Sequence, residues 1–228
     1  MKLQKETTSP QNLHGKWYRD ACGTAFAMEL VGERWSLMIV RELMLGGLRF
    51  SDLRRVLPGI SAKVLTERLD GLEQAGVLLR KDLPPPASVR IYELTEWGYY
   101  AEPAIQELGR WAARSSRHDP TLPLSAVGLM LSLRTMLDKE RAEELEADIG
   151  FDIGGETFRA RLSGGQLPIV RGEVDGAQAV FRAPAAPLVA AHFYGKLPAA
   201  QIAGLAIEGD AVLAARFAAL FELPPKIG

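Results

Sequence analysis

The feature that most constrains the fold of this chain is a pair of short amphipathic segments on either side of a Pro-Gly turn. The first segment begins at Ser51, a predicted helix cap, and ends before Pro58-Gly59, and the second begins at Ser61. Serine accepts hydrogen bonds from the free N–H groups of a first helical turn, and proline cannot continue a helix. Gly76 closes the second segment, as expected of a residue just past a helix. The pattern predicts a helix-turn-helix whose second helix covers residues 61–74.

The segments around this pair predict a winged domain made mainly of helices. Apolar residues recur every three or four positions between residues 28 and 45, as they do on buried helices. Two predicted strands follow Gly76, and the loop between them contains three successive prolines, which keep the chain extended. We expect this loop, residues 82–90, to form a wing. A longer helix is predicted from Trp97 to about Arg117, with an apolar stripe that requires a partner surface: Tyr100, Ala104, Leu108 and Trp111.

The second half of the chain has a different hydrophobic period. A linker rich in serine and proline is expected at residues 115–123. Beyond residue 150, short apolar segments alternate with glycine-containing turns, which is typical of hairpins, and helices precede and follow them. We therefore predict two domains. Residues 1–118 form the winged helix-turn-helix domain, and residues 124–228 form an α+β domain with helices on an antiparallel sheet.

The second helix of the pair has two distinct faces. At 100° per residue, its apolar residues Val64, Leu65, Leu69 and Leu72 fall within one arc, which we expect to be buried. A lysine and a threonine, at positions 63 and 66, lie on the opposite side, where they could contact base edges in the major groove of DNA. The alternative is an ordinary solvated face, which the acidic residues on the same side favour. Periodicity alone does not decide between these two interpretations.

The charge of the chain is balanced overall but basic around the predicted helix-turn-helix and wing. The 228 residues have a formal net charge of −1, which excludes a uniformly basic coat protein for nucleic acid. Residues 49–90 contain eight basic and five acidic side chains. The single cysteine excludes an internal disulfide, and the longest uncharged stretch, of 14 residues, is shorter than a membrane span. Since the sequence also shows no signal peptide, we expect a cytoplasmic protein that does not bind membranes.

Four motifs, given below in chain order, resemble those of the HxlR-type winged-helix regulators. The resemblance covers roughly residues 18–115. It implies a dimeric bacterial transcription factor whose terminal helices pair and whose helix 61–74 enters the major groove of a double-stranded operator. The motifs are Met28-Glu29-Leu30-Val31-Gly32-Glu33-Arg34-Trp35, Arg49-Phe50-Ser51-Asp52-Leu53-Arg54, Pro58-Gly59-Ile60-Ser61-Ala62-Lys63-Val64-Leu65 and Tyr92-Glu93-Leu94-Thr95.

Seven residues of this region are candidates for contact with DNA. Lysine, threonine and serine can reach base edges, arginine binds phosphate, and side chains of a wing can reach the backbone or the minor groove. The expected contacts are Ser61, Lys63 and Thr66 at bases or groove edges, Arg54 and Arg68 at phosphates, and Ser88 with Arg90 at the backbone or minor groove. Arg90 departs from the family, in which an acidic residue is frequent just before the tyrosine.

Cys22 lies just ahead of an apolar helix, and a helix N-terminus lowers the pKa of a thiol. Some HxlR-type proteins use a cysteine at this place as a redox or quinone sensor, so the resemblance makes Cys22 a candidate sensor. Family members often have Cys-Pro here, whereas this chain has Cys22-Gly23. The alternative is a small buried apolar residue.

The second domain resembles the sterol-carrier-protein-like family over about residues 124–223. The motifs are Gly204-Leu205-Ala206-Ile207-Glu208-Gly209-Asp210 and Arg159-Ala160-Arg161-Leu162-Ser163-Gly164-Gly165. In that family a sheet and helices enclose an apolar tunnel, which implies a hydrophobic small-molecule ligand. The domain could bind an effector, form a second dimer contact or be an inert appendage. The alternative is packed core, which is the more frequent role of aromatic and aliphatic residues at helical spacing. The candidate pocket residues are Leu188, Val189, Phe193, Tyr194, Phe217 and Phe221.

Three classes of function are weighed on this basis. The first is a dimeric, DNA-binding transcriptional regulator, and the second is a carrier of hydrophobic ligands whose winged-helix domain serves only dimerisation. An enzyme is not expected, because no nucleophile-base pair or phosphate-binding loop stands out. The three histidines are far apart in sequence and lack the spacing of a zinc site, so neither a metal nor a cofactor is expected.

Overall fold

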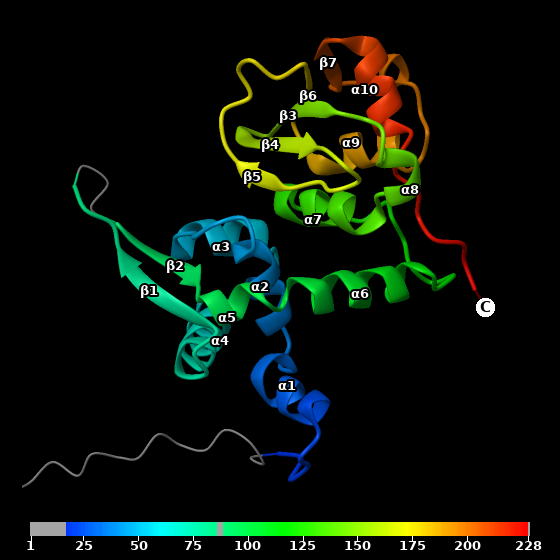
Figure 1. Ribbon diagram of the computed structural model, residues 1–228. Helices are drawn as coiled ribbons and strands as arrows, with labels where there is room; N and C mark the ends of the chain where they lie inside the picture. The colour runs from blue at the N-terminus through cyan, green and yellow to red at the C-terminus, as the bar shows by residue number, and fades with distance from the viewer. Residues whose placement is uncertain (1–16, 86–88, 228) are drawn as a thin grey trace, which may run out of the picture. The chain divides into compact units, whose positions relative to one another are not determined.

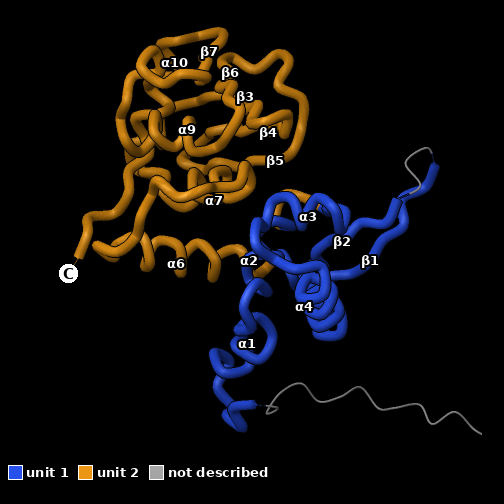
Figure 2. Tube along the Cα trace, turned by 180° about the vertical axis from the view of Figure 1, so that it is seen from behind, with its two compact units in different colours: residues 1–43, 47–99 blue, residues 44–46, 100–228 orange. Residues whose placement is uncertain are grey.

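The computed structural model describes residues 17–85 and 89–227 and divides into two compact units, coloured separately in Figure 2. The first unit contains residues 1–43 and 47–99, and the second contains residues 44–46 and 100–228. The main division along the chain falls between Tyr99 and Tyr100, ahead of the expected linker. The limits 1–118 and 124–228 therefore stay a prediction about which parts of the chain fold independently.

The first unit consists of helices followed by a two-stranded hairpin, as Figure 1 shows. The hairpin is antiparallel and pairs Leu78 with Leu94 and Asp82 with Arg90. The expected helix pair and the strands on either side of the wing loop are confirmed. In chain order the elements are α1 (Gly23–Val31), α2 (Ser36–Leu43), α3 (Phe50–Val56), α4 (Ala62–Gln74), β1 (Leu78–Asp82), β2 (Arg90–Leu94) and α5 (Glu96–Tyr99).

Helix α4 has the ends that its sequence predicts. The Ser61 hydroxyl accepts a hydrogen bond from the Val64 N–H at 3.2 Å and caps the first turn. Gly59, in the turn before α4, has a φ of +93°, and Gly76, just beyond α4, has a φ of +72°. Both values lie in the left-handed region, where glycine has no steric penalty from a Cβ atom.

Helix α3 begins earlier than predicted. Its N-cap is Arg49, and Ser51 lies within the first turn and does not cap it. The reason is the preceding residue: Leu48 pairs with Tyr92 in an isolated antiparallel bridge, so the chain turns into the helix as soon as this pairing ends.

The predicted apolar face of α4 is the face that packs. Leu65 and Leu69 are fully buried and Leu72 is 1% exposed, whereas Val64 is only half-buried. Full burial of one leucine side chain contributes about 1.5–3 kcal/mol. This contact with the core of the first unit, which includes Ile39 of α2, fixes which side of α4 faces outward.

The prediction of one long helix from Trp97 to about Arg117 is wrong, because two helices occupy this segment. Helix α5 ends at Tyr99, and α6 covers Glu102–Ala113. Pro103 stands in the first turn of α6. It has no N–H to donate to the carbonyl of Tyr99, and its ring would clash with that carbonyl in a continuous helix. Helix α6 belongs to the second unit.

The second unit has the predicted α+β composition, but its sheet is mixed and not antiparallel. The five strands lie in the order β5-β4-β3-β6-β7, and β3 and β6 are parallel, with Phe151 opposite Phe181. The elements after α6 are α7 (Ala126–Met136), α8 (Lys139–Ala142), β3 (Ala147–Ile153), β4 (Glu156–Leu162), β5 (Ile169–Arg171), β6 (Ala179–Ala183), α9 (Ala186–Phe193), η1 (Ala199–Gln201), β7 (Ala206–Gly209) and α10 (Ala211–Ala218).

The parallel pair arises because the turn at Asp175-Gly176 belongs to a crossover and does not close a hairpin. Residues 172–178 carry the chain from the edge strand β5 to the far side of β3. The guanidinium of Arg159 donates hydrogen bonds to the carbonyls of Asp175 at 2.8 Å and Glu173 at 3.3 Å, and it forms an ion pair with Asp148 of β3. These contacts, which are remote in sequence, hold the crossover in place.

Helices α6 and α7 of the second unit are joined by charged side chains. Arg134 of α7 donates to the carboxylate of Glu102 at 2.6 Å, and Arg110 of α6 donates to the carbonyl of Thr135 at 2.6 Å.

In the described part of the chain, none of the helices is long and apolar enough to cross a membrane.

Candidate nucleic-acid interface

The outward face of α4 presents a lysine, a threonine and the end of the helix that Ser61 caps. The Lys63 side chain is 86% exposed, and its Nζ lies 4.0 Å from a carboxylate oxygen of Glu67. Thr66 is exposed and donates its hydroxyl to the carbonyl of Ala62 at 3.0 Å, so its oxygen can still accept a hydrogen bond. The structure thus brings three predicted contact residues to one exposed stretch of α4.

Arg68 lies elsewhere, although it is on the same helix. Its side chain is 22% exposed and forms an ion pair with Glu33, and its Nε donates to the carbonyl of Arg34 at 3.1 Å. The guanidinium is therefore held against the turn between α1 and α2. Sequence reasoning had no signal for this partner, which is 34 residues away along the chain.

Two exposed arginines of the α3 region carry charge that the first unit does not neutralise. Among residues 17–85 and 89–227, neither Arg49 nor Arg54 has a side-chain hydrogen bond or ion pair. Arg54 was predicted as a phosphate contact, whereas Arg49 was missed. Its place in a segment of basic excess was the available signal.

The cations of the hairpin, in contrast, are paired with acids. Arg90 contacts Asp82 through two hydrogen bonds, with Nε–Oδ1 at 2.8 Å and Nη2–Oδ2 at 3.2 Å. These bonds lower the pKa of the Asp82 carboxyl below its usual range, so the pair stays charged. Lys81 pairs with Glu93 at 3.1 Å, and Arg80 pairs with Asp70 and Glu73 of α4. The predicted contact Ser88 lies outside the described residues.

Cys22 is an exposed free thiol at the N-cap of α1, so the interpretation as a buried apolar residue is wrong for the single chain. Hydrogen bonds from the backbone and side chain of Thr24, and from the backbone of Ala25, lower the pKa of the Cys22 thiol. These bonds stabilise the thiolate, which is the form that reacts with oxidants and electrophiles.

Two apolar helix surfaces remain uncovered within their own units. Helix α1 has no buried residue, and Met28 is 37% exposed. On α6, Leu108 is 44% and Trp111 is 72% exposed, and Tyr100, just before α6, is 69% exposed. Several large apolar side chains left exposed on one helix are typical of an association interface.

The candidate pocket residues of the second unit pack closely around an aromatic cluster. Phe193, Phe217 and Phe221 are fully buried, with ring centroids 5.0–6.0 Å apart. Val189 is also fully buried, whereas Leu188 and Tyr194 are half-buried. The Tyr194 hydroxyl lies 2.7 Å from that of Ser132, and desolvation raises the pKa of the tyrosine. A bound apolar ligand would have to displace the aromatic cluster, so this site stays a prediction.

Comparison with known proteins agrees with the helix-turn-helix geometry. The family model described as HxlR-like helix-turn-helix matches residues 30–120. The uncharacterized HTH-type transcriptional regulator YvaP of Bacillus subtilis is 40% identical over 87 residues, which are 38% of this chain and 80% of YvaP. The chain belongs to the HxlR family.

Other members of the HxlR family align with the same part of the chain. The HTH-type transcriptional regulator YodB of Bacillus subtilis is 41% identical over 86 residues, which are 38% of this chain and 77% of YodB. The structure of the reduced form of YodB has a TM-score of 0.40 at 36% identity and covers 44% of this chain and 100% of that chain. The HxlR match ends at residue 120, and the likeness of residues 124–223 to sterol-carrier proteins stays a prediction.

Proposed function

We propose that this HxlR-family protein is a homodimeric, DNA-binding transcriptional regulator. Helix α4 enters the major groove of an operator, Ser61, Lys63 and Thr66 contact base edges or groove edges, and Arg54 together with Arg49 binds phosphates. The wing contacts the backbone or minor groove with Arg90 and Ser88. A protein with this activity acts where the chromosome lies, which for a bacterial cell is the cytoplasm.

The observation that carries this proposal is the outward face of α4. The helix buries its leucines completely and exposes Lys63 and Thr66 at the end next to the Ser61 cap. This is the end that a helix-turn-helix inserts into the major groove, where lysine donates to guanine and a threonine methyl contacts thymine. A merely solvated helix, which was the alternative, would need no accompanying unpaired cations such as Arg49 and Arg54.

The uncovered faces of α1 and α6 support the dimer. Helix α1 has nine residues, none of them fully buried, so its contact with α4 stabilises it only in part, and helices of this length are marginal in water without packing. Pairing with a second copy would cover the apolar surface of both helices. A twofold dimer also presents two α4 helices to a palindromic operator.

Replacing Lys63 by alanine tests the proposed role of α4. The wild-type protein is first used to enrich a duplex from a random library, and binding is then titrated on that duplex and on a scrambled duplex. We expect Lys63→Ala to weaken binding to the enriched duplex by about tenfold, since a good base contact is worth about 1–3 kcal/mol. The matched control is Lys139→Ala, which removes an exposed lysine of the second unit. No enrichment of any sequence, or equal losses in both variants, would refute the proposed contact.

Replacing Asp82 by asparagine tests the wing. The substitution removes the carboxylate that holds Arg90 and leaves the arginine free to bind a phosphate. We expect tighter binding to enriched and scrambled duplexes alike, and a salt dependence of log Kd that is steeper by about one phosphate contact per wing. The control is Asp82→Asn combined with Arg90→Ala, which should lose this gain. An unchanged salt slope in Asp82→Asn would show that the wing does not reach DNA.

Control by oxidation is a second proposed activity, and the exposed Cys22 thiol with its lowered pKa favours it. We expect Cys22 to react with iodoacetamide with a pH midpoint below that of an ordinary cysteine. Oxidant should change the affinity for the enriched duplex in the wild-type protein but not in Cys22→Ser. Equal affinity before and after oxidation in both proteins would exclude a sensor.

For the second unit we propose a hydrophobic small-molecule effector as the ligand class. Support comes from the sterol-carrier-like motifs and from the apolar character of the cluster around Phe193. The competing function is a carrier of such ligands whose winged helix serves only dimerisation. Native mass spectrometry of freshly purified protein detects a co-purified ligand, and sequence-selective DNA binding distinguishes the regulator from the carrier.

A further inference from the structure

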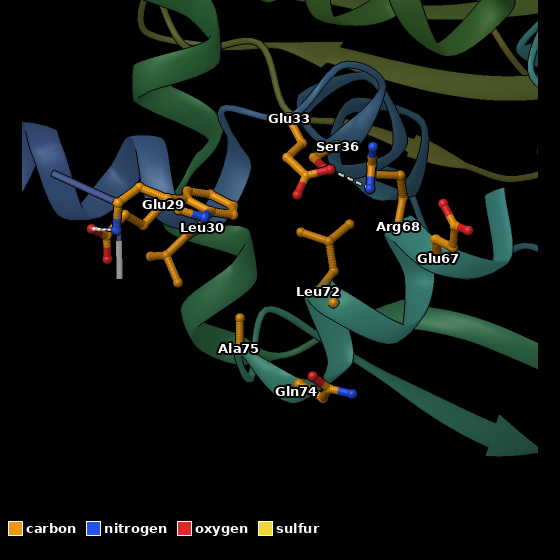
Figure 3. Close-up of a pocket in the computed structure, with 11 residues that line it drawn as sticks. Glu29, Leu30, Glu33, Ser36, Glu67, Arg68, Leu72, Gln74 and Ala75 are labelled. Atoms are coloured by element: carbon orange, nitrogen blue, oxygen red, sulfur yellow. Dashed lines mark hydrogen bonds and ion pairs between the residues drawn. The ribbon is translucent and has the colours of Figure 1, made fainter. Parts of the chain in front are cut away.

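The turn between α1 and α2 contacts both α4 and the turn that leads into α4. In the middle of α4, Arg68 forms its ion pair with Glu33 and donates to the carbonyl of Arg34. Figure 3 shows the Glu33 carboxylate and the Arg68 guanidinium directed at each other from their two elements. Ahead of α4, a Cβ atom added to Gly59 would lie 3.9 Å from the ring of Trp35, so this ring stands against the turn that leads into the helix.

The backbone of this turn is itself unusual. Trp35 has a φ of +80°, a conformation that costs a non-glycine residue of order 1–3 kcal/mol and persists only where its surroundings hold it. The guanidinium of Arg34 lies 5.2 Å from the centre of the Trp35 ring. Arg68 donates to the carbonyl of Arg34 and forms an ion pair with Glu33, the two residues before Trp35. It is therefore one of the groups that hold the turn in this conformation.

Apolar packing between α1 and α4 is incomplete at this place. A hollow of about 90 Å³ separates the two helices, with Leu30 of α1 and Leu72 of α4 on its walls. Arg68 reaches the 33–34 turn at the edge of this hollow, so its ion pair and hydrogen bond add to the direct contact between α1 and α4. Figure 3 shows the hollow with this ion pair on its rim.

We infer that Arg68 is a positioning residue for DNA recognition, which fixes the orientation of α4 through Glu33 and the carbonyl of Arg34 and does not bind a phosphate. This inference rests on the proposed function and replaces the phosphate contact expected from the sequence. Glu33 has the same positioning role, because it holds Arg68, although its carboxylate would repel DNA. Removing either partner therefore disturbs how α4 meets base edges, while the number of phosphate contacts stays the same.

Salt titration separates positioning from phosphate binding. The dissociation constant is measured by fluorescence anisotropy between 50 and about 200 mM KCl, on the duplex enriched by the wild-type protein and on its scrambled counterpart. We expect Arg68→Ala and Glu33→Gln to weaken binding to the enriched duplex by a similar factor of about tenfold, without changing the slope of log Kd against log[KCl]. Arg54→Ala is the matched control, and it should lower the slope by about two on both duplexes, one phosphate contact for each copy in the dimer.

A variant in which the charges of Glu33 and Arg68 are exchanged controls for loss of folding. Glu33→Arg with Arg68→Glu should bind the enriched duplex more tightly than either single reversal, and Glu33→Gln keeps the arginine if Arg68→Ala fails to fold. Two results overturn the inference: a slope reduced by about two in Arg68→Ala, one for each copy in the dimer, or unchanged or tighter binding in Glu33→Gln. If the wild-type protein enriches no duplex, the proposed function itself is refuted. This outcome differs from the two results that overturn only the role of Arg68.

Discussion

Replacing Trp111 by glutamate is expected to raise the dissociation constant of the dimer by at least about a thousandfold. An aromatic residue at the centre of an interface contributes about 2 kcal/mol or more, and a twofold interface contains each residue twice. A loss of about 4 kcal/mol corresponds to a factor of about a thousand. Because the Trp111 side chain is 72% exposed in the single chain, the free energy of unfolding should change little.

Sedimentation equilibrium over a range of protein concentrations measures this effect. Val212→Glu is the matched control, since Val212 of α10 is also 72% exposed and apolar. The variant Trp111→Glu should be monomeric at concentrations where the wild-type protein and the control are dimers. It should also lose most of its affinity for a duplex with two half-sites. Dimers of unchanged stability, or equal weakening by Val212→Glu, would place the interface elsewhere.

Phe193→Ala should lower the free energy of unfolding of the second unit by about 3–5 kcal/mol. The Phe193 side chain is fully buried and contacts four other phenylalanine rings, including those of Phe181 and Phe217 at 5.0 and 6.0 Å between centroids. Its removal leaves a cavity and deletes these contacts. Chemical denaturation followed by far-UV circular dichroism measures the change, and Val170→Ala, at a 58% exposed position of β5, provides the control.

The same variant also tests the apolar-ligand proposal. If Phe193 is packed core in solution, the loss should be near the full value for a buried phenylalanine, and an added fatty acid should not stabilise the wild-type protein. If a ligand normally occupies this place, the loss in ligand-free protein should be small, since the ring then has few partners to lose. A shift of the unfolding midpoint by fatty acid would support an effector site.

Local signals in the sequence predicted most of the first unit. The helix pair followed from Ser61, Pro58 and Gly76, because caps and turn residues act within a few positions of themselves. The buried face of α4 followed from its period. The break between α5 and α6 was also encoded locally, in Pro103, but the predicted helix ran through it.

Contacts between distant parts of the chain could not be predicted in this way. The partner of Arg68 lies 34 residues away, and nothing in the period of α4 indicates that this arginine turns inward. The parallel pairing of β3 with β6 likewise depends on the crossover that Arg159 holds. On sequence grounds, every basic residue of a basic segment is a candidate phosphate contact. Only the ion pairs in the structure show which of these cations remain free to bind phosphate.

The available charge of the proposed interface is therefore smaller than its composition suggests. Residues 49–90 contain eight basic side chains, but Arg68, Arg80, Lys81 and Arg90 are held in ion pairs with acids. A modest number of phosphate contacts limits non-specific attachment to DNA, so base contacts from α4 have to supply much of the selectivity.

Genomic footprinting in the host is the most direct test that α4 of a dimer recognises DNA. Discrete protected sites are predicted, each with two half-sites about one helical turn apart, and they should disappear in a strain that carries Lys63→Ala with Thr66→Ala. Protection without discrete sites, or protection that survives this double substitution unchanged, would contradict the account.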